Sequence, residues 1–85
     1  MTVALMWEAR AAAGRGEDLL AWARGRELTP PPLRRETFRA PGYRVLVITW
    51  WDADYAAEVP ELPDPDAELV TRAVHRWRFD SLGEN

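Results

Sequence analysis

The sequence predicts a single α+β domain that spans residues 1–85 and is built on a four-stranded antiparallel sheet. Two patterns predict it: apolar residues alternate in segments 2–10, 43–51 and 73–82, and a glycine-rich, acidic segment after the first of them has helical spacing. A third observation is composition, because 47% hydrophobic and 29% charged residues are typical of a folded chain. A chain of 85 residues provides one core and commonly gains buried surface from a partner.

The first predicted strand covers residues 2–10, TVALMWEAR. Val3, Leu5 and Trp7 fall on one side of it, and Met6 falls on the other. Because both sides are apolar in its first half, we expect this strand in the middle of the sheet, covered on each side.

A helix is predicted over about residues 16–28. A glycine-rich lead-in turns the chain, and the acidic pair Glu17 and Asp18 then suits the positive end of a helix dipole. Leucine and tryptophan follow at helical spacing, and the triple proline at 30–32 prevents the helix from continuing.

Residues 33–51 are predicted to form a β-hairpin. Its turn holds Pro41 and Gly42 in the two central positions, which is the signature of a type II turn. The second arm, YRVLVITWW, is β-branched, aromatic and apolar on both sides, so we expect a central, buried strand.

The segment from 52 to 71 carries weaker signals. Asp52 favours a short helix through residue 59, after which three prolines require an extended loop. Residues 65–70 fit one further helical turn, with Pro65 in its first position.

A last strand is predicted over residues 73–82, which alternate cleanly. His75, Trp77 and Phe79 point to one side, and arginines and an aspartate point to the other. We expect the aromatic side to be covered and to belong to the core.

The predicted order β-α-β-β-(α)-β is the split βαβ, or ferredoxin-like, pattern. The first and third strands are then central in the antiparallel sheet. A helix covers one side, and no second layer remains in the chain for the other side, which is too apolar to face water. A second copy of the chain is the simplest cover, so we expect a homodimer.

Three residues at element ends carry a family resemblance: Gly14 after the first strand, and Trp51 followed by Asp52 at the end of the third. With this element order, the chain resembles the antibiotic biosynthesis monooxygenase-like dimeric α+β barrel family over most of residues 2–82. The resemblance implies a homodimer in which two sheets face each other in a barrel with the helices outside. Some members oxidise aromatic polyketides without metal or flavin, a related branch degrades heme, and ligands lie between sheet and helices of one subunit.

The chain departs from the active members of that family. The heme-degrading branch carries an asparagine in the first strand, seven residues before the glycine, where this chain has Trp7. That branch also uses a tryptophan and a histidine on the second helix, whereas His75 falls in the last predicted strand. The resemblance therefore assigns no catalytic residue.

The candidate ligand-binding residues are Trp7, Trp51, His75 and Trp77. The tryptophans could line a flat pocket for a small apolar or aromatic ligand, and His75, the only histidine, could act as a general base. Alternatively, the aromatic side chains fill the core and a dimer interface, where such residues are enriched. Glu8 and Arg10, two apart on one strand face, are interpreted as surface charge balance.

Composition excludes several classes of site. The chain has no cysteine, so disulfides and cysteine-ligated zinc are excluded, and one histidine leaves no convincing metal or cofactor site. A net charge of −3 disfavours nucleic-acid binding. The sequence shows no signal peptide and no run of the about 20 apolar residues that cross a bilayer, so we expect a cytoplasmic location. All eleven basic residues are arginine, which suggests a GC-rich bacterial genome.

Two classes of function remain open from the sequence. The first is a non-enzymatic dimeric domain that binds a small apolar ligand or a partner protein. The second is a cofactor-free monooxygenase-like enzyme acting on an aromatic small molecule. A cavity between sheet and helix beside Trp7 and His75 would favour the enzyme, and a filled space would favour the binding domain.

Overall fold

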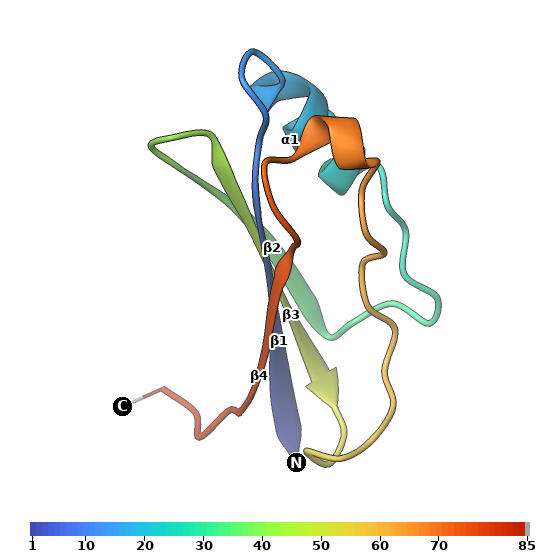
Figure 1. Ribbon diagram of the computed structural model, residues 1–85. Helices are drawn as coiled ribbons and strands as arrows, with labels where there is room; N and C mark the ends of the chain where they lie inside the picture. Colours follow the sequence, from blue (N-terminus) through green and yellow to red (C-terminus); the bar gives the residue numbers. More distant parts are fainter. Residues whose placement is uncertain (85) are drawn as a thin grey trace.

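The computed structural model describes residues 1–84, which form a four-stranded antiparallel sheet, one α-helix and one short 3-10 turn (Figure 1). In chain order the elements are β1 (Thr2–Arg10), α1 (Gly16–Arg24), β2 (Arg34–Ala40), β3 (Arg44–Asp52), η1 (Ala67–Leu69) and β4 (His75–Asp80). The strands lie in the order β2-β3-β1-β4. The prediction of an antiparallel α+β sheet with the first and third strands in the middle is confirmed.

β1 is hydrogen-bonded along both edges, as expected for a strand that is apolar on both sides. It pairs with β3 over its whole length, from Thr2 opposite Asp52 to Arg10 opposite Arg44. β4 pairs only with β1, and β2 only with β3, so β4 and β2 are the two edges of the sheet. Because each of these pairs is antiparallel, β1 and β2 run parallel, with β3 between them.

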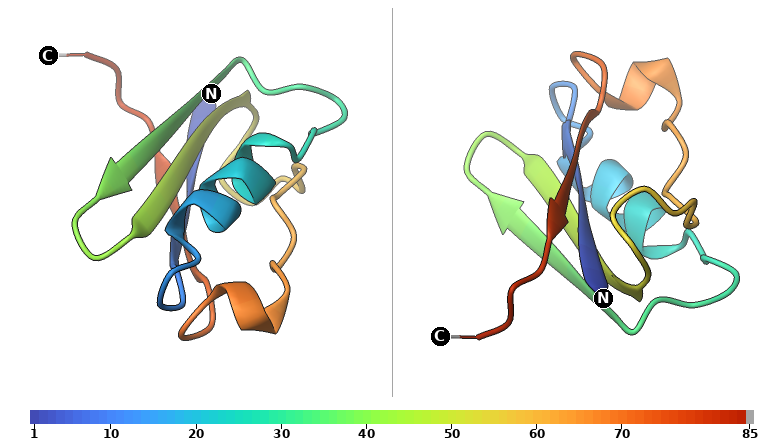
Figure 2. Two further views of the ribbon diagram at one scale, coloured as in Figure 1. Left: turned by 90° about the horizontal axis from the view of Figure 1, so that it is seen from above. Right: turned by 90° about the horizontal axis from the view of Figure 1, so that it is seen from below.

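The helix and the connecting segments lie on one side of the sheet, which we call the covered face (Figure 1). The two end-on views in Figure 2 show the same one-sided arrangement. The opposite side, which we call the open face, carries no second layer of described residues. The segment after β4 leads away toward this open side (Figure 1).

The core lies mainly between the covered face and α1. The buried residues that β1 and β3 direct to that side are Val3, Leu5, Trp7, Ala9, Val45, Val47, Thr49 and Trp51. Leu19, Leu20 and Ala23 of α1 pack against them, and this spacing is that of an amphipathic helix. Leu62 and Leu69, from the segment between β3 and β4, complete the same cluster.

The hairpin turn confirms the role predicted for Gly42, whose φ is 80°. Tyr43 follows with a φ of 56°, a left-handed value that tyrosine rarely adopts. Its ring lies against Gly16, where a Cβ atom would overlap the ring carbons. A side chain at Gly16 would therefore displace the Tyr43 ring.

Two predictions for the connecting segments were wrong. α1 ends at Arg24 rather than near residue 28, because Gly25 closes the helix and Leu28 packs on the core instead. No helix forms over residues 53–59. Asp52 is the last residue of the β3 ladder and does not cap a helix. The further turn expected over residues 65–70 is present as η1, but it begins at Ala67, so Pro65 is not its first residue as predicted.

Candidate functional site

The space between the sheet and α1, where the family resemblance places a ligand, is filled with side chains. Trp7 is 4% exposed, and its ring stacks on Trp22 of α1 with the ring centroids 5.9 Å apart. Beside Trp7, between the sheet and Leu62 of the segment after β3, a void of about 10 Å³ remains, about enough for one water molecule. It cannot admit an aromatic ligand.

Trp51 lies on the same covered face as Trp7, in a second and smaller part of the core. It is 6% exposed and packs with Val3 and Leu5. Its indole Nε1 donates a hydrogen bond to Thr49 Oγ1 at 2.9 Å. The Trp7 Nε1, by contrast, has no hydrogen-bond partner among the described residues. Both tryptophans therefore serve as core residues.

His75 and Trp77 lie on the open face, so the four candidate ligand residues are not brought together. Trp77 is 45% exposed and Phe79 is 51% exposed. The rings of His75 and Trp77 meet edge to face, with centroids 5.3 Å apart. The expectation that His75, Trp77 and Phe79 form a covered core face is wrong within a single chain.

The reason is that Arg76 and Arg78 occupy the covered side of β4. Arg78 Nη1 donates to the carbonyl oxygens of Tyr55 and Ala57, each at 2.7 Å. Arg76 Nη1 donates to the carbonyl oxygen of Leu62 at 2.7 Å. These carbonyl groups belong to the extended segment after β3, which has no strand partner, and a guanidinium group supplies several donors for them. The arginines thus fix which side of β4 faces outward.

Arg35 has a comparable role at the other edge of the sheet. From β2 it donates hydrogen bonds to the carbonyl oxygens of Ala23 and Arg26, at the end of α1. Arg35 thereby ties β2 to the last turn of α1 and to the residues just after it. Burial lowers the pKa of the Arg35 guanidinium from its ordinary value.

The open face is apolar over most of its area. From β4 to β2, its rows are His75, Glu8, Leu46 and Phe38; then Trp77, Met6, Ile48 and Glu36; then Phe79, Ala4, Trp50 and Arg34. The Arg34 guanidinium lies over the Trp50 ring, 4.8 Å from its centroid. Its apolar side chains adjoin one another across all four strands, which makes this face a candidate interaction surface.

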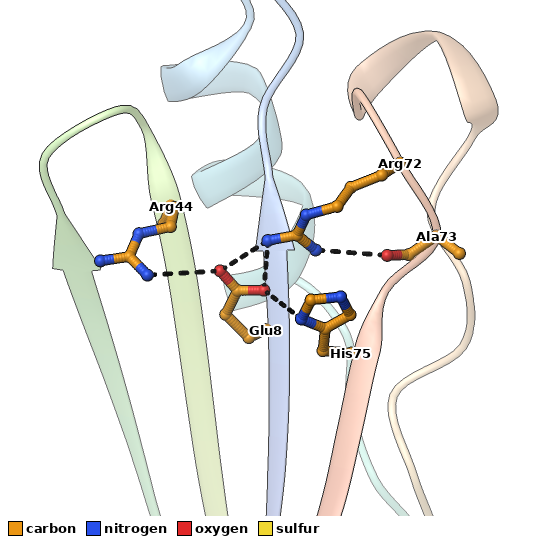
Figure 3. Close-up of polar contacts among 5 residues, drawn as sticks. All are labelled: Glu8, Arg44, Arg72, Ala73 and His75. Carbon is orange, nitrogen blue, oxygen red and sulfur yellow. Dashed lines mark hydrogen bonds and ion pairs between the residues drawn. The ribbon is translucent and has the colours of Figure 1, made fainter.

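A charged cluster lies at one end of the open face (Figure 3). Glu8 is only 7% exposed. Its carboxylate accepts hydrogen bonds from Arg72 Nη2 at 2.7 Å and 3.0 Å. It also lies 3.5 Å from His75 Nδ1 and 4.0 Å from Arg44 Nη1. Groups from β3, from β4 and from the segment before β4 therefore surround one buried carboxylate.

A bulge in the chain before β4 brings Arg72 to Glu8. His75 pairs with Glu8, and Val70 pairs with Ala11. The segment from Val70 to His75 therefore advances by five residues where the paired segment from Glu8 to Ala11 advances by three. The two extra residues bow away from β1 and interrupt the alternation of side chains. Arg72 consequently reaches the open face.

Sequence reasoning missed Arg72, Arg44 and the burial of Glu8. The interpretation of Glu8 and Arg10 as surface charge balance was wrong, because the short contacts of the buried Glu8 are to Arg72. One signal was present, since Glu8 continues the apolar side of β1 that holds Met6. Its partner lies 64 residues away and has no local signature.

The cluster allows two kinds of chemistry. The first is proton transfer at His75, whose Nδ1 lies 3.5 Å from Glu8 Oε1. Alternatively, Arg72 neutralises Glu8 so that the face can be covered by a partner at a lower desolvation cost. The described residues contain no group of three side chains placed to hold a metal ion.

A hollow of about 680 Å³ lies beside the bulge, between η1 and the start of β4. Its lining includes Pro65, Val70 and Val74, together with Arg72 and Arg76. Its volume falls within the range of small-molecule sites, about 300–1,000 Å³.

Comparisons with protein-family models, with curated proteins and with solved structures give no match for this chain. Within residues 1–84, no helix has the length and apolar character needed to cross a bilayer. The geometry itself defines an α+β domain with one packed sheet face and one exposed apolar face that bears a buried carboxylate.

Proposed function

We propose that this chain is a non-enzymatic homodimeric domain of the dimeric α+β barrel kind, in which the open faces of two copies pack together. The observation that carries the proposal is the apolar open face, with Phe38, Trp77 and Phe79 exposed on it. Each Å² of apolar surface removed from water contributes about 25 cal/mol. The strand order supports a ferredoxin-like classification, with an extended segment and η1 in place of a second helix.

The open face supplies a large part of the area that a dimer interface needs. Strands about 4.8 Å apart, with a rise of about 3.3 Å per residue, give a four-stranded face of several hundred Å². A stable interface buries about 800 Å² on each partner. The segment after β4 leads to the same side and adds to the surface available (Figure 1).

The filled space beside Trp7 supports a non-enzymatic role, because it removes the ligand site of the active relatives. For a small apolar ligand, we propose the hollow between Pro65, Val70 and Val74. We further propose a bacterial source and a cytoplasmic location, with no nucleic-acid or membrane partner, on the composition and charge of the chain.

A second candidate function rests on the contact between Glu8 and His75. In a cofactor-free monooxygenase-like enzyme, His75 would take a proton from an aromatic substrate held against Trp77 on the open face. This candidate ranks second because the bonds from Arg72 already neutralise Glu8, which weakens its effect on the imidazole.

Light scattering after size exclusion, at micromolar concentration, tests the first function. We expect about twice the chain mass of 9.7 kDa. Ile48→Glu, in the middle of the open face, should give a monomer. Ala21→Glu, on the exposed side of α1, is the matched control and should remain a dimer. A monomeric wild-type chain would contradict the proposal. Turnover of an aromatic compound that His75→Gln abolishes would favour the enzyme.

A further inference from the structure

The open side of β3 is apolar around its middle residue and carries opposite charges at its two ends. Its side chains, in order, are Arg44, Leu46, Ile48, Trp50 and Asp52. A basic and an acidic residue thus stand four positions on either side of Ile48, each about 13 Å from it. The side chains of Arg44 and Asp52 are 52% and 81% exposed, so both are free to meet a partner.

Neighbouring segments extend this polarity at the end with Arg44. Arg10 stands directly opposite Arg44 in the ladder, and Arg72 reaches the same end of the face. Asp80 ends β4 near Asp52 but lies opposite Val3, on the covered side, and Arg34 of β2 adjoins the Asp52 end of the open face. The amino group of Met1, 3.8 Å from Asp52 Oδ1, forms only an exposed contact, and such contacts are weak. The end of the open face with Arg10, Arg44 and Arg72 is therefore its basic end, and Asp52 stands at the opposite end.

We infer that two copies pack open face to open face about a two-fold axis that crosses the strands at the row of Trp77, Met6 and Ile48. Arg44 of each copy then pairs with Asp52 of the other. The inference rests on the proposed homodimer and adds its orientation. In a two-fold interface each contact occurs twice, so two such ion pairs form at opposite ends.

On the axis row itself Trp77 and Glu36 meet their own counterparts, and Glu36 is paired with Arg34 of its own chain. Rows on either side of the axis exchange, so Glu8 and its cluster face Ala4 of the other copy, and Leu46 faces Trp50. The strands of two packed sheets lie within about 30° of each other. At such an angle Arg44 of one copy and Asp52 of the other are displaced sideways by about one strand spacing. The long side chains of Arg10 and Arg44, side by side at the basic end, cover that displacement.

The other simple orientation is disfavoured by charge. A two-fold axis parallel to the strands would place β1 of one copy over β3 of the other. Arg44 of each copy would then face Arg10 of the other. Like charges brought together in a partly desolvated interface repel each other. The axis across the strands replaces this repulsion with attraction.

Charge reversal tests the orientation by sedimentation at low salt. Asp52→Arg and Arg44→Asp should each raise the dimer dissociation constant by about tenfold or more. An equimolar mixture of the two variants should associate as wild type does, and the double variant should again form homodimers. Glu27→Arg, which reverses a charge on the exposed segment after α1, is the control and should leave the constant unchanged.

The outcomes separate the orientation from the dimer itself. A monomeric wild type overturns both, whereas a wild-type dimer that neither variant weakens overturns only the orientation. Tighter association of Arg44→Asp would show the axis parallel to the strands, because the new carboxylate would face Arg10. Asp52 is highly exposed, so its variant should fold, and circular dichroism melts check this. Arg44→Gln serves as a milder second variant because Arg44 contacts Glu8.

Discussion

Arg72 Nη2 donates to both carboxylate oxygens of Glu8, at 2.7 Å and 3.0 Å, although 64 residues separate the two in the chain. The contact ties the bulge before β4 to the central strand. A carboxylate that is 7% exposed needs such a partner, because burying a charge alone is costly. The pair therefore stabilises the fold on the very face that is proposed to meet a second copy.

Arg72→Ala should destabilise the protein by about 2–3 kcal/mol, because it leaves Glu8 buried without its closest partner. Adding Glu8→Leu should recover most of this loss, since leucine suits the apolar face. Chemical denaturation at a fixed protein concentration measures both. Arg39→Ala removes only an exposed pair with Glu17 and should change stability by less than about 0.5 kcal/mol. An Arg72→Ala protein as stable as the Arg39→Ala control would show that the contact between Arg72 and Glu8 contributes little to stability.

Trp77→Ala should leave the chain folded but weaken the dimer by about tenfold or more, because Trp77 is an exposed aromatic residue in the middle of the proposed interface. Circular dichroism reports the fold, and sedimentation reports the association. If the variant unfolds even at concentrations where wild type is monomeric, then Trp77 belongs to the core of the single chain.

Trp7→Ala should cost about 3–5 kcal/mol, enough to unfold a domain of this size, because it empties the middle of the core. Trp7→Phe should cost much less, since it keeps a ring against Trp22 and removes an Nε1 that has no partner among the described residues. Thermal melts distinguish the two. Equal losses from both variants would mean that the indole nitrogen matters after all.

Gly42→Val should destabilise the hairpin by about 1 kcal/mol or more, because a β-branched residue is strained at a φ of 80°. Gly42→Asn should cost less, since asparagine tolerates left-handed backbone. Melting temperatures measured side by side give the order. A valine variant that melts with wild type would show that the turn adopts another conformation.

Much of the sheet could be predicted from the sequence because its signals are local. The apolar alternation of β1 and β3 predicted two central strands, and Pro41 with Gly42 predicted the turn between the hairpin arms. The helix was predicted in the right place but too long, because a weak stop at Gly25 was outweighed by the stronger signal of the prolines beyond it.

The site could not be predicted in the same way because its contacts are distant in the chain. Alternation showed that β4 has an aromatic side and an arginine side, but not which one is covered. That choice depends on the carbonyl groups of Tyr55, Ala57 and Leu62, which carry no side-chain signature. The link from Glu8 to Arg72 depends in turn on a bulge whose position only the register reveals.

The bulge between Val70 and His75 adds an even number of residues relative to β1. Within β4 side chains alternate with a period of two, so the pairing of His75 with Glu8 keeps Trp77 on the open side and Arg76 on the covered side. A bulge absorbs extra residues without changing the register of the strand beyond it. Length variation in this segment should therefore be tolerated as long as His75 stays opposite Glu8. A shift of β4 by one residue along β1 would exchange its faces and send the arginines outward.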